Sequence, residues 1–588
     1  MSKTLFKKVD YSLSKLIHDI DHGDIGLPEL QRPFVWSGRD VRNLFDSMYK
    51  GFPVGYFLFW SNEHLANTKQ IGTESKQAKV PRLLIVDGQQ RLTSLYAVLK
   101  GKAVLTEDYK EKQLQIAFRP RDGQFEVADA AIKRDPEFIP DISVVWKDGT
   151  STYKLIRDFL KNLSSSKEIS NEEEETISDS IDQLYKLEDY PFTAMEISST
   201  VDEEQVSDIF VRINSKGKKL NQADFILTLL SVFWDEGRKQ LEDFCKKARI
   251  PASSDQEITP YNNFIMPDPD HLLRVSIGLG FKRARLKNVY SVLRGKDMET
   301  GKFSEERRDE QFDVLKKAQS YTTDLQNWHE FMKVLVKAGF RSRKMVSSET
   351  TLLYAYAMFL IGKVDFKVDP YTLRNLIARY YFMLVVTGRY TNSPETVMER
   401  DLARLRGLAN QKEFIRTIEK LINDSLTNDF WQITLVNNLE TSSAQSPALF
   451  AYYASLNLLE AKVLFSKMKV SELIDPILKG TRNPIERHHL FPKDYLKSIG
   501  ITETRRINQV ANFALVEWGD NNDISNQSPK EYYPEYLSRY SNEELRPMTE
   551  WHALPDGWES MDYNEFLEER RKLMASVIKK GFYSLCVN

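Results

Sequence analysis

The segment RLLIVDGQQRLTSLYAVLKG, Arg82 to Gly101, constrains the fold of this chain more than any other stretch. Its first part, Leu83 to Val86, is a short apolar run that predicts a buried strand, and Asp87-Gly88 predicts a tight turn. The apolar residues that follow recur at the i, i+3, i+4 and i+7 spacing of a helix face: Leu92, Leu95, Tyr96 and Leu99. A helix is therefore expected from about Gln89 to Gly101. A strand that turns through glycine into a helix indicates an α/β domain. Further strands are expected at Val54 to Trp60 and at Gln113 to Phe118.

This turn has the features of an anion-binding site. It leaves the first N–H groups of the helix pointing outward at the positive end of the helix dipole, where phosphate binds well. Arg91 could add a bidentate contact to phosphate oxygens, and Gln89 and Gln90 could hydrogen-bond other parts of a nucleotide. Asp87 could hold a magnesium ion or orient a water molecule. The alternative is an ordinary helix that Asp87 caps and from which Arg91 extends into solvent.

Two further segments have the composition of ligand-facing loops. In LPELQRPFVW, from Leu27 to Trp36, Gln31 and Arg32 stand directly before a proline, which favours an extended backbone at Arg32. In FVRINSKGKKLN, from Phe210 to Asn221, Asn214 lies in an expected turn among three lysines. Such a turn could close over a phosphate.

Taken together, LPELQRPFVW, VDGQQRLTSL and FVRINSKGKKL resemble the DGQQR domain of the GmrSD-type modification-dependent restriction proteins, whose fold is similar to the ParB and sulfiredoxin nucleotide-binding fold. The resemblance covers about residues 1 to 235. In that family the domain binds and hydrolyses a nucleoside triphosphate and helps to sense modified DNA. We therefore expect a site for ATP or GTP that comprises Gln31, Arg32, Asp87, Gly88, Gln89, Gln90, Arg91 and Asn214.

A second group of residues that could carry out catalysis lies near the C-terminus. Two of the eight histidines, His488 and His489, are adjacent in PIERHHLFPK. If Ile485 to Leu490 is a strand, the two imidazoles point to opposite faces, so one can bind a metal ion while the other reaches a substrate. Phosphodiester hydrolysis needs such a division, with a metal ion that stabilises charge and a neutral imidazole that takes a proton from water. The alternative is a pair that makes ordinary surface hydrogen bonds.

The order HHLFPK, then NFALV, then NN followed by IS, resembles the HNH nuclease motif, also called ββα-metal, of the C-terminal half of GmrSD-type proteins. The resemblance covers roughly residues 440 to 588. Residue by residue, it implies that His488 is the first metal ligand and His489 the general base. Asn512 matches the asparagine that holds the loop, and Asn521 best matches the second metal ligand, with Asn522 as the alternative. One imidazole and an amide oxygen, without a thiolate, favour Mg²⁺ or Mn²⁺ over zinc.

If this chain binds nucleic acid, it must do so through local basic patches, because 82 basic and 84 acidic side chains give a net charge of −2. One basic stretch is FKRARLKNVYSVLRGK, which contains Lys282, Arg283, Arg285 and Lys287. Another is the Arg505-Arg506 pair next to the histidine motif. We expect both to contact DNA phosphates, the alternative being that they are solvated helix faces.

The 588 residues exceed the size of a single hydrophobic core. We expect a multidomain, predominantly α-helical protein: an α/β ParB/sulfiredoxin-like domain at 1–235, a helical region at 236–440, and a helical domain at 441–588 that carries the ββα-metal HNH motif. The last domain is expected to begin with a helix from Pro447 to Lys467, followed by a boundary segment at Asp475 to Pro484 that two prolines and a glycine mark. The longest charge-free stretches, such as Thr351 to Gly362, fall short of the roughly 20 residues of a membrane span. With two distant cysteines and no secretory signal, we expect a cytoplasmic protein without a disulfide framework or a membrane partner.

These features together predict an NTP-dependent, modification-sensing DNA endonuclease that acts in type IV restriction of phage. Its partners would be modified double-stranded DNA and nucleotide, with a homodimer as one option. Two alternatives remain at this point. One is an HNH nicking enzyme that another signal triggers or that acts on RNA, and the other is a nucleotide-regulated DNA-binding module whose nuclease fold is inactive.

Overall fold

The computed structural model describes residues 4–26, 34–61, 81–106, 110–147, 149–201, 205–206, 209, 222–254, 257–296, 304–474 and 485–587. The chain forms two compact units, residues 1–234 and 235–588.

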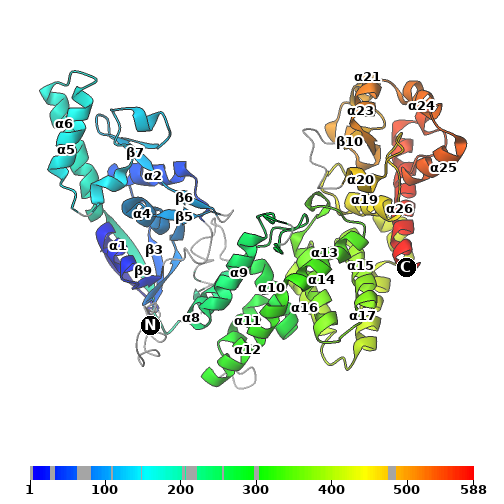
Figure 1. Ribbon diagram of the computed structural model, residues 1–588, viewed down its shortest axis with the longest axis horizontal. Helices are drawn as coiled ribbons and strands as arrows, with labels where there is room; N and C mark the ends of the chain where they lie inside the picture. Colours follow the sequence, from blue (N-terminus) through cyan, green and yellow to red (C-terminus); the bar gives the residue numbers. More distant parts are fainter. Residues whose placement is uncertain are drawn as a thin grey trace. The chain divides into compact units, whose positions relative to one another are not determined.

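A five-stranded mixed sheet forms the centre of the first unit (Figure 1). Its strands lie in the order β1-β9-β3-β4-β2, with β1–β9 and β3–β4 antiparallel and β9–β3 and β4–β2 parallel. The strands are β1 (Phe6–Ser12), β2 (Ile25–Gly26), β3 (Phe57–Ser61), β4 (Leu83–Asp87) and β9 (Pro191–Ile197). Two separate antiparallel pairs are β5 (Ala103–Leu105) with β6 (Glu111–Gln113) and β7 (Ile116–Arg119) with β8 (Gln124–Val127).

The helices α1 (Leu13–Asp21), α2 (Gly38–Tyr49) and α4 (Gln89–Lys100) share a hydrophobic core with one face of this sheet. The helices α5 (Thr152–Ser164) and α6 (Asn171–Tyr185) pack against each other and extend that core, and the unit ends with α8 (Gln222–Phe233). Phe57 and Phe59 of β3 belong to the core that these helices share. Leu58, between them, packs instead with Val86 and Ile197 in a second cluster, as the alternation of a strand requires.

The α/β architecture expected at the N-terminus is present, but two strands differ from the prediction. The strand at Leu83 to Val86 and the helix from Gln89 are confirmed as β4 and α4, and Gly101 ends the helix with a φ of 59°. The strand expected from Val54 begins only at Phe57, because the backbone carbonyls of residues 54 and 56 bind a side chain. The strand expected from Gln113 to Phe118 is divided between β6 and β7.

The second unit is mostly helical. Its larger helices up to residue 458 are α9 (Asp235–Lys247), α10 (Pro269–Phe281), α11 (Leu286–Leu293), α12 (Glu305–Thr322), α13 (Leu325–Lys337), α14 (Glu349–Val364), α15 (Pro370–Thr387), α16 (Pro394–Ala403), α17 (Gln411–Ser425) and α19 (Pro447–Leu458). The charge-free run from Thr351 to Gly362 is buried throughout in α14, which packs against α10 and α15. Among the described residues, no helix is both long and apolar enough to cross a bilayer.

The C-terminal part of this unit contains a strand–strand–helix arrangement. Strand β10 (Ile485–His489) pairs antiparallel with β11 (Phe513–Glu517), and α23 (Trp518–Ile524) follows β11 and packs against both strands. The surrounding elements are α18 (Leu435–Asn438), α20 (Val470–Leu473), α21 (Lys493–Ser498), α22 (Thr504–Ile507), the 3₁₀ turn η7 (Val510–Asn512), α24 (Pro529–Leu537), α25 (Asn542–Trp551) and α26 (Tyr563–Val587).

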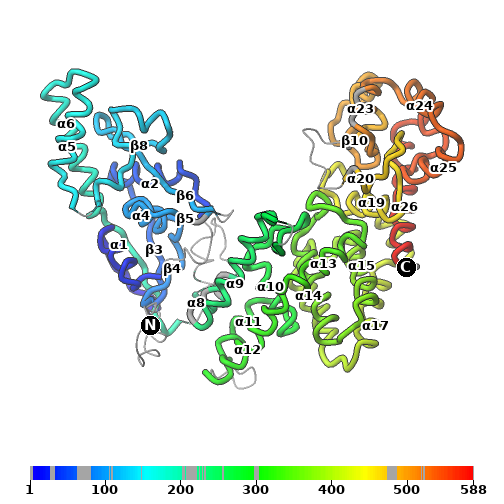
Figure 2. The backbone as a smooth tube through the Cα atoms, in the orientation of Figure 1, coloured from blue at the N-terminus to red at the C-terminus, as the bar shows by residue number. Residues whose placement is uncertain are grey.

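The long helix α26 joins the motif to the rest of the unit. It packs against α15, α19 and η7, and Figure 2 shows the red C-terminal helix beside the yellow α19. Helices on both sides of residue 440, the expected domain boundary, therefore lie in one compact unit. The helix expected from Pro447 to Lys467 ends at Leu458, because the chain turns at Glu460 (φ 53°) and Leu464 then bonds to the β11 backbone. The boundary segment expected at Asp475 to Pro484 lies outside the described residues.

Candidate functional site

The turn between β4 and α4 depends on Gly88. This residue is the N-cap of α4 and has a φ of 92°, a left-handed conformation that favours glycine. A Cβ at Gly88 would also lie 2.5 Å from the Phe57 ring. No side chain caps the helix here, so the alternative in which Asp87 is the cap is wrong. The turn has the form expected of an anion site at a helix N-terminus.

Arg91 is not solvated, and it does not point away from the protein. Its guanidinium donates to the carbonyl of Val54 and, at 3.0 Å, to the carbonyl of Tyr56. A Cβ at Gly55, which has a φ of 89°, would collide with Arg91 Nη1. Arg91 thus holds the loop before β3 against the first turn of α4, a role that the sequence did not reveal.

Several polar side chains lie close together at this turn. Asp87 Oδ2 lies 3.9 Å from Arg91 Nη2. Burial, and secondarily the Asp87 carboxylate, raise the pKa of the Tyr56 hydroxyl. The Gln90 side chain accepts a 3.0 Å hydrogen bond from the Val35 N–H, which ties the turn to the residues that follow the QRP segment.

The structure thus gathers Asp87, Gly88, Gln89, Gln90 and Arg91 at one turn. The other residues expected at the nucleotide site, Gln31, Arg32 and Asn214, lie outside the described residues.

The paired histidines lie on β10 and point to opposite faces, as expected for neighbours on a strand. His488 is 3% exposed, and its ring meets Tyr532 of α24 edge-on at 5.8 Å. His489 is half-buried on the other face, where its ring lies 4.5 Å from that of Phe513.

His489 also contacts a residue that the sequence reasoning missed. Its Nε2 lies 2.9 Å from Asn508 Oδ1. Because an amide oxygen only accepts, Nε2 carries the hydrogen and the lone pair lies on Nδ1. Burial lowers the pKa of His489, and the hydrogen bond to Asn508 partly opposes this effect. The imidazole is therefore neutral at neutral pH, the form that can accept a proton.

Asn512 holds the loop that follows β10. It is fully buried in η7, and its side-chain oxygen accepts from the Phe491 N–H at 2.9 Å. Its amide nitrogen donates to the carbonyls of Phe491 and Ile507, each at 3.1 Å. These bonds fix the loop two residues beyond His489.

The residues expected to hold a metal ion are only partly described. The backbone of Asn521 lies in α23, but its side chain is outside the described set. His488 faces α24, and Tyr536 of α24 also donates to the Asp520 carbonyl of α23 at 3.5 Å. His488 is therefore on the face from which a ligand on α23 could approach, and an imidazole with an amide oxygen suits Mg²⁺ or Mn²⁺.

The long C-terminal helix contributes two side chains that bind backbone carbonyls near the histidine motif, and the sequence indicated neither contact. Arg570 is fully buried and donates to the carbonyls of Ala511 and His552. The Tyr563 hydroxyl donates to the carbonyl of Arg506 at 2.8 Å. An arginine at a regularly apolar helix position is the one signal that could have marked Arg570 in advance.

The basic stretch expected to bind DNA makes contacts within the protein. Lys282 pairs with Asp365 at 2.5 Å and Arg283 with Glu399 at 3.0 Å. Glu399 also accepts from the N–H groups of Ala284 and Arg285. Carboxylates of the protein itself therefore already partly neutralise the charges of Lys282 and Arg283.

The second basic pair lies beside the histidine motif. Arg505 and Arg506 are exposed on α22, and they line an open hollow with Asn437, Glu440, Glu503 and Gln509. Arg506 donates to the Asn564 side chain at 2.8 Å. Arg505 is therefore the better placed of the two for a phosphate contact.

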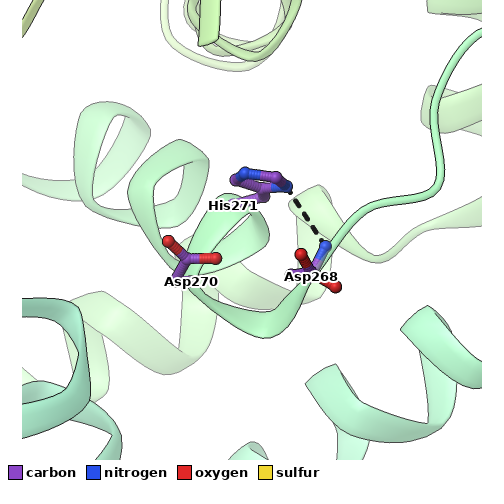
Figure 3. A group of neighbouring side chains, drawn as sticks. All are labelled: Asp268, Asp270 and His271. Atoms are coloured by element: carbon purple, nitrogen blue, oxygen red, sulfur yellow. Dashed lines mark hydrogen bonds between the residues drawn. The ribbon is translucent and has the colours of Figure 1, made fainter. Parts of the chain in front are cut away.

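One group of side chains could suggest a metal site elsewhere. Asp268, Asp270 and His271 lie together at the start of α10 (Figure 3). Asp268 is the N-cap, its N–H donates to His271 Nδ1, and its carboxylate pairs with Arg249 at 2.6 Å. Asp270 lies 3.9 Å from Arg274. Helix capping and ion pairs account for this cluster.

Comparisons with known proteins agree with the N-terminal resemblance. Residues 13–231 match the family described as GmrSD restriction endonuclease, N-terminal domain. The chain is also similar to a Methanocaldococcus jannaschii protein named Uncharacterized protein MJ0686. The two are 24% identical over 576 residues, which cover 91% of this chain and 88% of the archaeal protein. The first match suggests a restriction-type nuclease with DNA as its substrate.

Proposed function

We propose that this chain is a metal-dependent DNA endonuclease of the type IV restriction kind. In this proposal the first unit binds a nucleoside triphosphate and senses modified DNA, and the second unit hydrolyses the phosphodiester by HNH chemistry. The match of residues 13–231 to the GmrSD N-terminal domain supports the restriction-type activity. Defence against phage DNA in the cytoplasm is the corresponding biological role.

One observation carries the assignment of the cutting centre to the second unit. His489 stands at the end of β10, half-buried, beside a loop that Asn512 clamps, and β11 and α23 complete the strand–strand–helix arrangement. A surface histidine pair without a function would need neither the clamp nor the partial burial. This geometry favours a nuclease over the binding module with an inactive nuclease fold.

His489 is the proposed general base. Its Nε2 donates to Asn508, and its neutral form leaves Nδ1 to take a proton from the attacking water. Asn512 keeps the loop beyond the base in one conformation, which preserves its orientation toward the phosphodiester.

His488 and Asn521 would hold the divalent ion, Mg²⁺ or Mn²⁺. When bound, the ion supplies charge stabilisation to the pentavalent phosphate and to the leaving oxygen. The burial of His488 against Tyr532 fixes the orientation of its ring, as a ligand imidazole requires.

The nucleotide site of the first unit would use backbone N–H groups more than Arg91. The turn at Gly88 presents the start of α4 without a side-chain cap, which suits the phosphates of ATP or GTP. The side chains of Gln89 and Asp87 are at the same turn. Arg91 would act from behind by holding the loop at Tyr56 in place.

The proposal is tested on matched plasmids that are unmodified, methylated, glucosylated or phosphorothioated. Each is incubated with the protein and Mg²⁺ or Mn²⁺, with and without ATP or GTP. We expect nicked or linear product from at least one modified plasmid, more product with nucleotide, and none with excess EDTA. Intact plasmids in every reaction would refute the proposal, and cleavage of RNA alone would favour the RNA-directed alternative.

A further inference from the structure

Arg570 of α26 is a charged side chain in an unusual position. It is 0% exposed, and burial lowers its pKa. Within the described part of the chain no carboxylate pairs with it. Its donors instead reach backbone carbonyls: Nη1 to Ala511 at 2.6 Å, and Nε and Nη2 to His552 at 3.2 and 3.1 Å. A buried cation without an acidic partner is costly, so these carbonyl bonds must hold it firmly.

Another buried arginine of the same unit is paired with carboxylates, which is the usual way to compensate a buried positive charge. Arg238 of α9 is 1% exposed and pairs with Asp235 at 3.3 Å and Glu242 at 3.2 Å. All of these residues lie on one helix, far along the chain from the histidine motif. These two ion pairs lie within one helix, whereas the hydrogen bonds of Arg570 join separate segments.

The Ala511 carbonyl belongs to the peptide that joins Ala511 to Asn512. Asn512 fixes the end of β10 twice, because its carbonyl accepts from the Leu490 N–H at 2.8 Å and its side chain accepts from the Phe491 N–H at 2.9 Å. Movement of the 511–512 peptide would therefore move the residues directly after His489.

We propose that Arg570 is a positioning residue of the cutting centre, which acts through the 511–512 peptide to hold Asn512 and thereby the loop beside His489. This inference rests on the proposed nuclease function. Arg570 touches neither substrate nor metal in this account. Its contribution is to keep the base within the small geometric tolerance that catalysis allows.

The test compares Arg570→Met and Arg570→Lys with the matched control Arg238→Met. Single-turnover nicking is measured at saturating DNA and Mn²⁺, together with DNA affinity and the hydrogen exchange of the Leu490 and Phe491 amides. We expect Arg570→Met to nick about 100-fold more slowly, as for a misplacement of about 1 Å, with DNA affinity within about twofold of wild type. In this variant the Leu490 and Phe491 amides should lose protection from hydrogen exchange. Arg238→Met should lower the melting temperature but change neither the nicking rate nor the exchange of these two amides.

Arg570→Lys keeps the charge but loses the planar fork that reaches two carbonyls, so we expect an intermediate rate. If Arg570→Met does not fold, the nicking rate and amide exchange of Arg570→Lys test the inference. A double-mutant cycle with Asn512→Ala should be non-additive, because both changes disturb one loop.

A folded Arg570→Lys or Arg570→Met variant with the wild-type rate and protected amides would overturn the inference. If the wild-type protein itself cuts no DNA, the proposed function fails, but the exchange of the two amides still tests whether Arg570 positions the loop.

Discussion

At the turn between β4 and α4, the Arg91 side chain donates two hydrogen bonds to backbone carbonyls within the protein. We expect Arg91→Ala to lower the free energy of unfolding of the first unit by about 2 to 4 kcal/mol, because buried bonds from a charged donor are lost. Urea unfolding measures this change, and Arg39→Ala on the exposed side of α2 is the control. Unchanged stability combined with lost nucleotide binding would instead make Arg91 a phosphate ligand.

His552 gives the second unit a dependence on pH. It is fully buried at the end of α25, its Nε2 donates to the Lys462 carbonyl at 2.9 Å, and burial lowers its pKa to about 4. The unfolded chain, with a histidine pKa near 6.5, therefore binds a proton that the folded chain excludes. Stability is complete above about pH 6.5 and falls as the pH drops toward 4, by up to about 3 kcal/mol.

Melting temperatures at pH 7.5 and pH 5 check this expectation. His552→Gln keeps a donor for Lys462 but cannot gain the proton, so its melting temperature should depend less on pH than that of the wild type. An equal pH dependence in both proteins would show that another group is responsible.

For single residues, the sequence predicted local structure but not contacts between distant segments. The strand that carries His488 and His489 was predictable, because a local pattern defines it. The catalytic roles of these two residues and of Asn512 stay predictions. Asn508 and Arg570 could not be found in this way. Their roles depend on contacts made after folding, between segments separated by 19 and 59 residues.

At the scale of elements, Glu399 shows why the basic stretch before and within α11 is a weaker candidate for DNA binding than its charge suggests. Glu399, on α16, is paired with Arg283 and Arg406 and accepts from two backbone N–H groups. We expect Glu399→Gln to lower the free energy of unfolding by about 2 kcal/mol. Thermal unfolding measures the effect, with the exposed Glu305→Gln of α12 as the control, and equal melting curves for both variants would contradict it.

Helix α22 offers the better test of DNA contact. Arg505 is exposed there, beside the motif. Arg505→Gln should reduce the magnitude of the salt slope of DNA binding by about one unit, because one phosphate contact is lost. The control is Lys572→Gln, whose lysine is already paired with Glu568 and Glu569. If the salt slope of DNA binding changes equally in both variants, Arg505 does not contact a DNA phosphate.

Elements were predictable where a local signal defines them. Gly88 and Gly101 mark both ends of α4, so its limits followed from the sequence. The start of β3 did not, because the Arg91 side chain takes the carbonyls of Val54 and Tyr56. The end of α19 was also missed, since the chain leaves the helix to reach β11.

At the scale of the whole molecule, the two compact units separate the two proposed activities. The turn at Gly88 belongs to residues 1–234, and the histidine motif belongs to residues 235–588. The sequence changes from mixed to helical periodicity near the division between these two units. It could not show that α19 and α26 pack with α15, because that contact joins segments far apart in the chain.

The measurement that tests the central claim most directly is plasmid cleavage by His489→Ala beside the wild-type protein. Both are assayed with Mn²⁺ and nucleotide on the modified plasmid that the wild type cuts best, and His329→Ala of α13 controls for the loss of a histidine elsewhere. We predict that His489→Ala folds and binds DNA like the wild type but does not cut, because the general base is gone. His329→Ala should cut normally. Cleavage by His489→Ala at the wild-type rate would contradict the account.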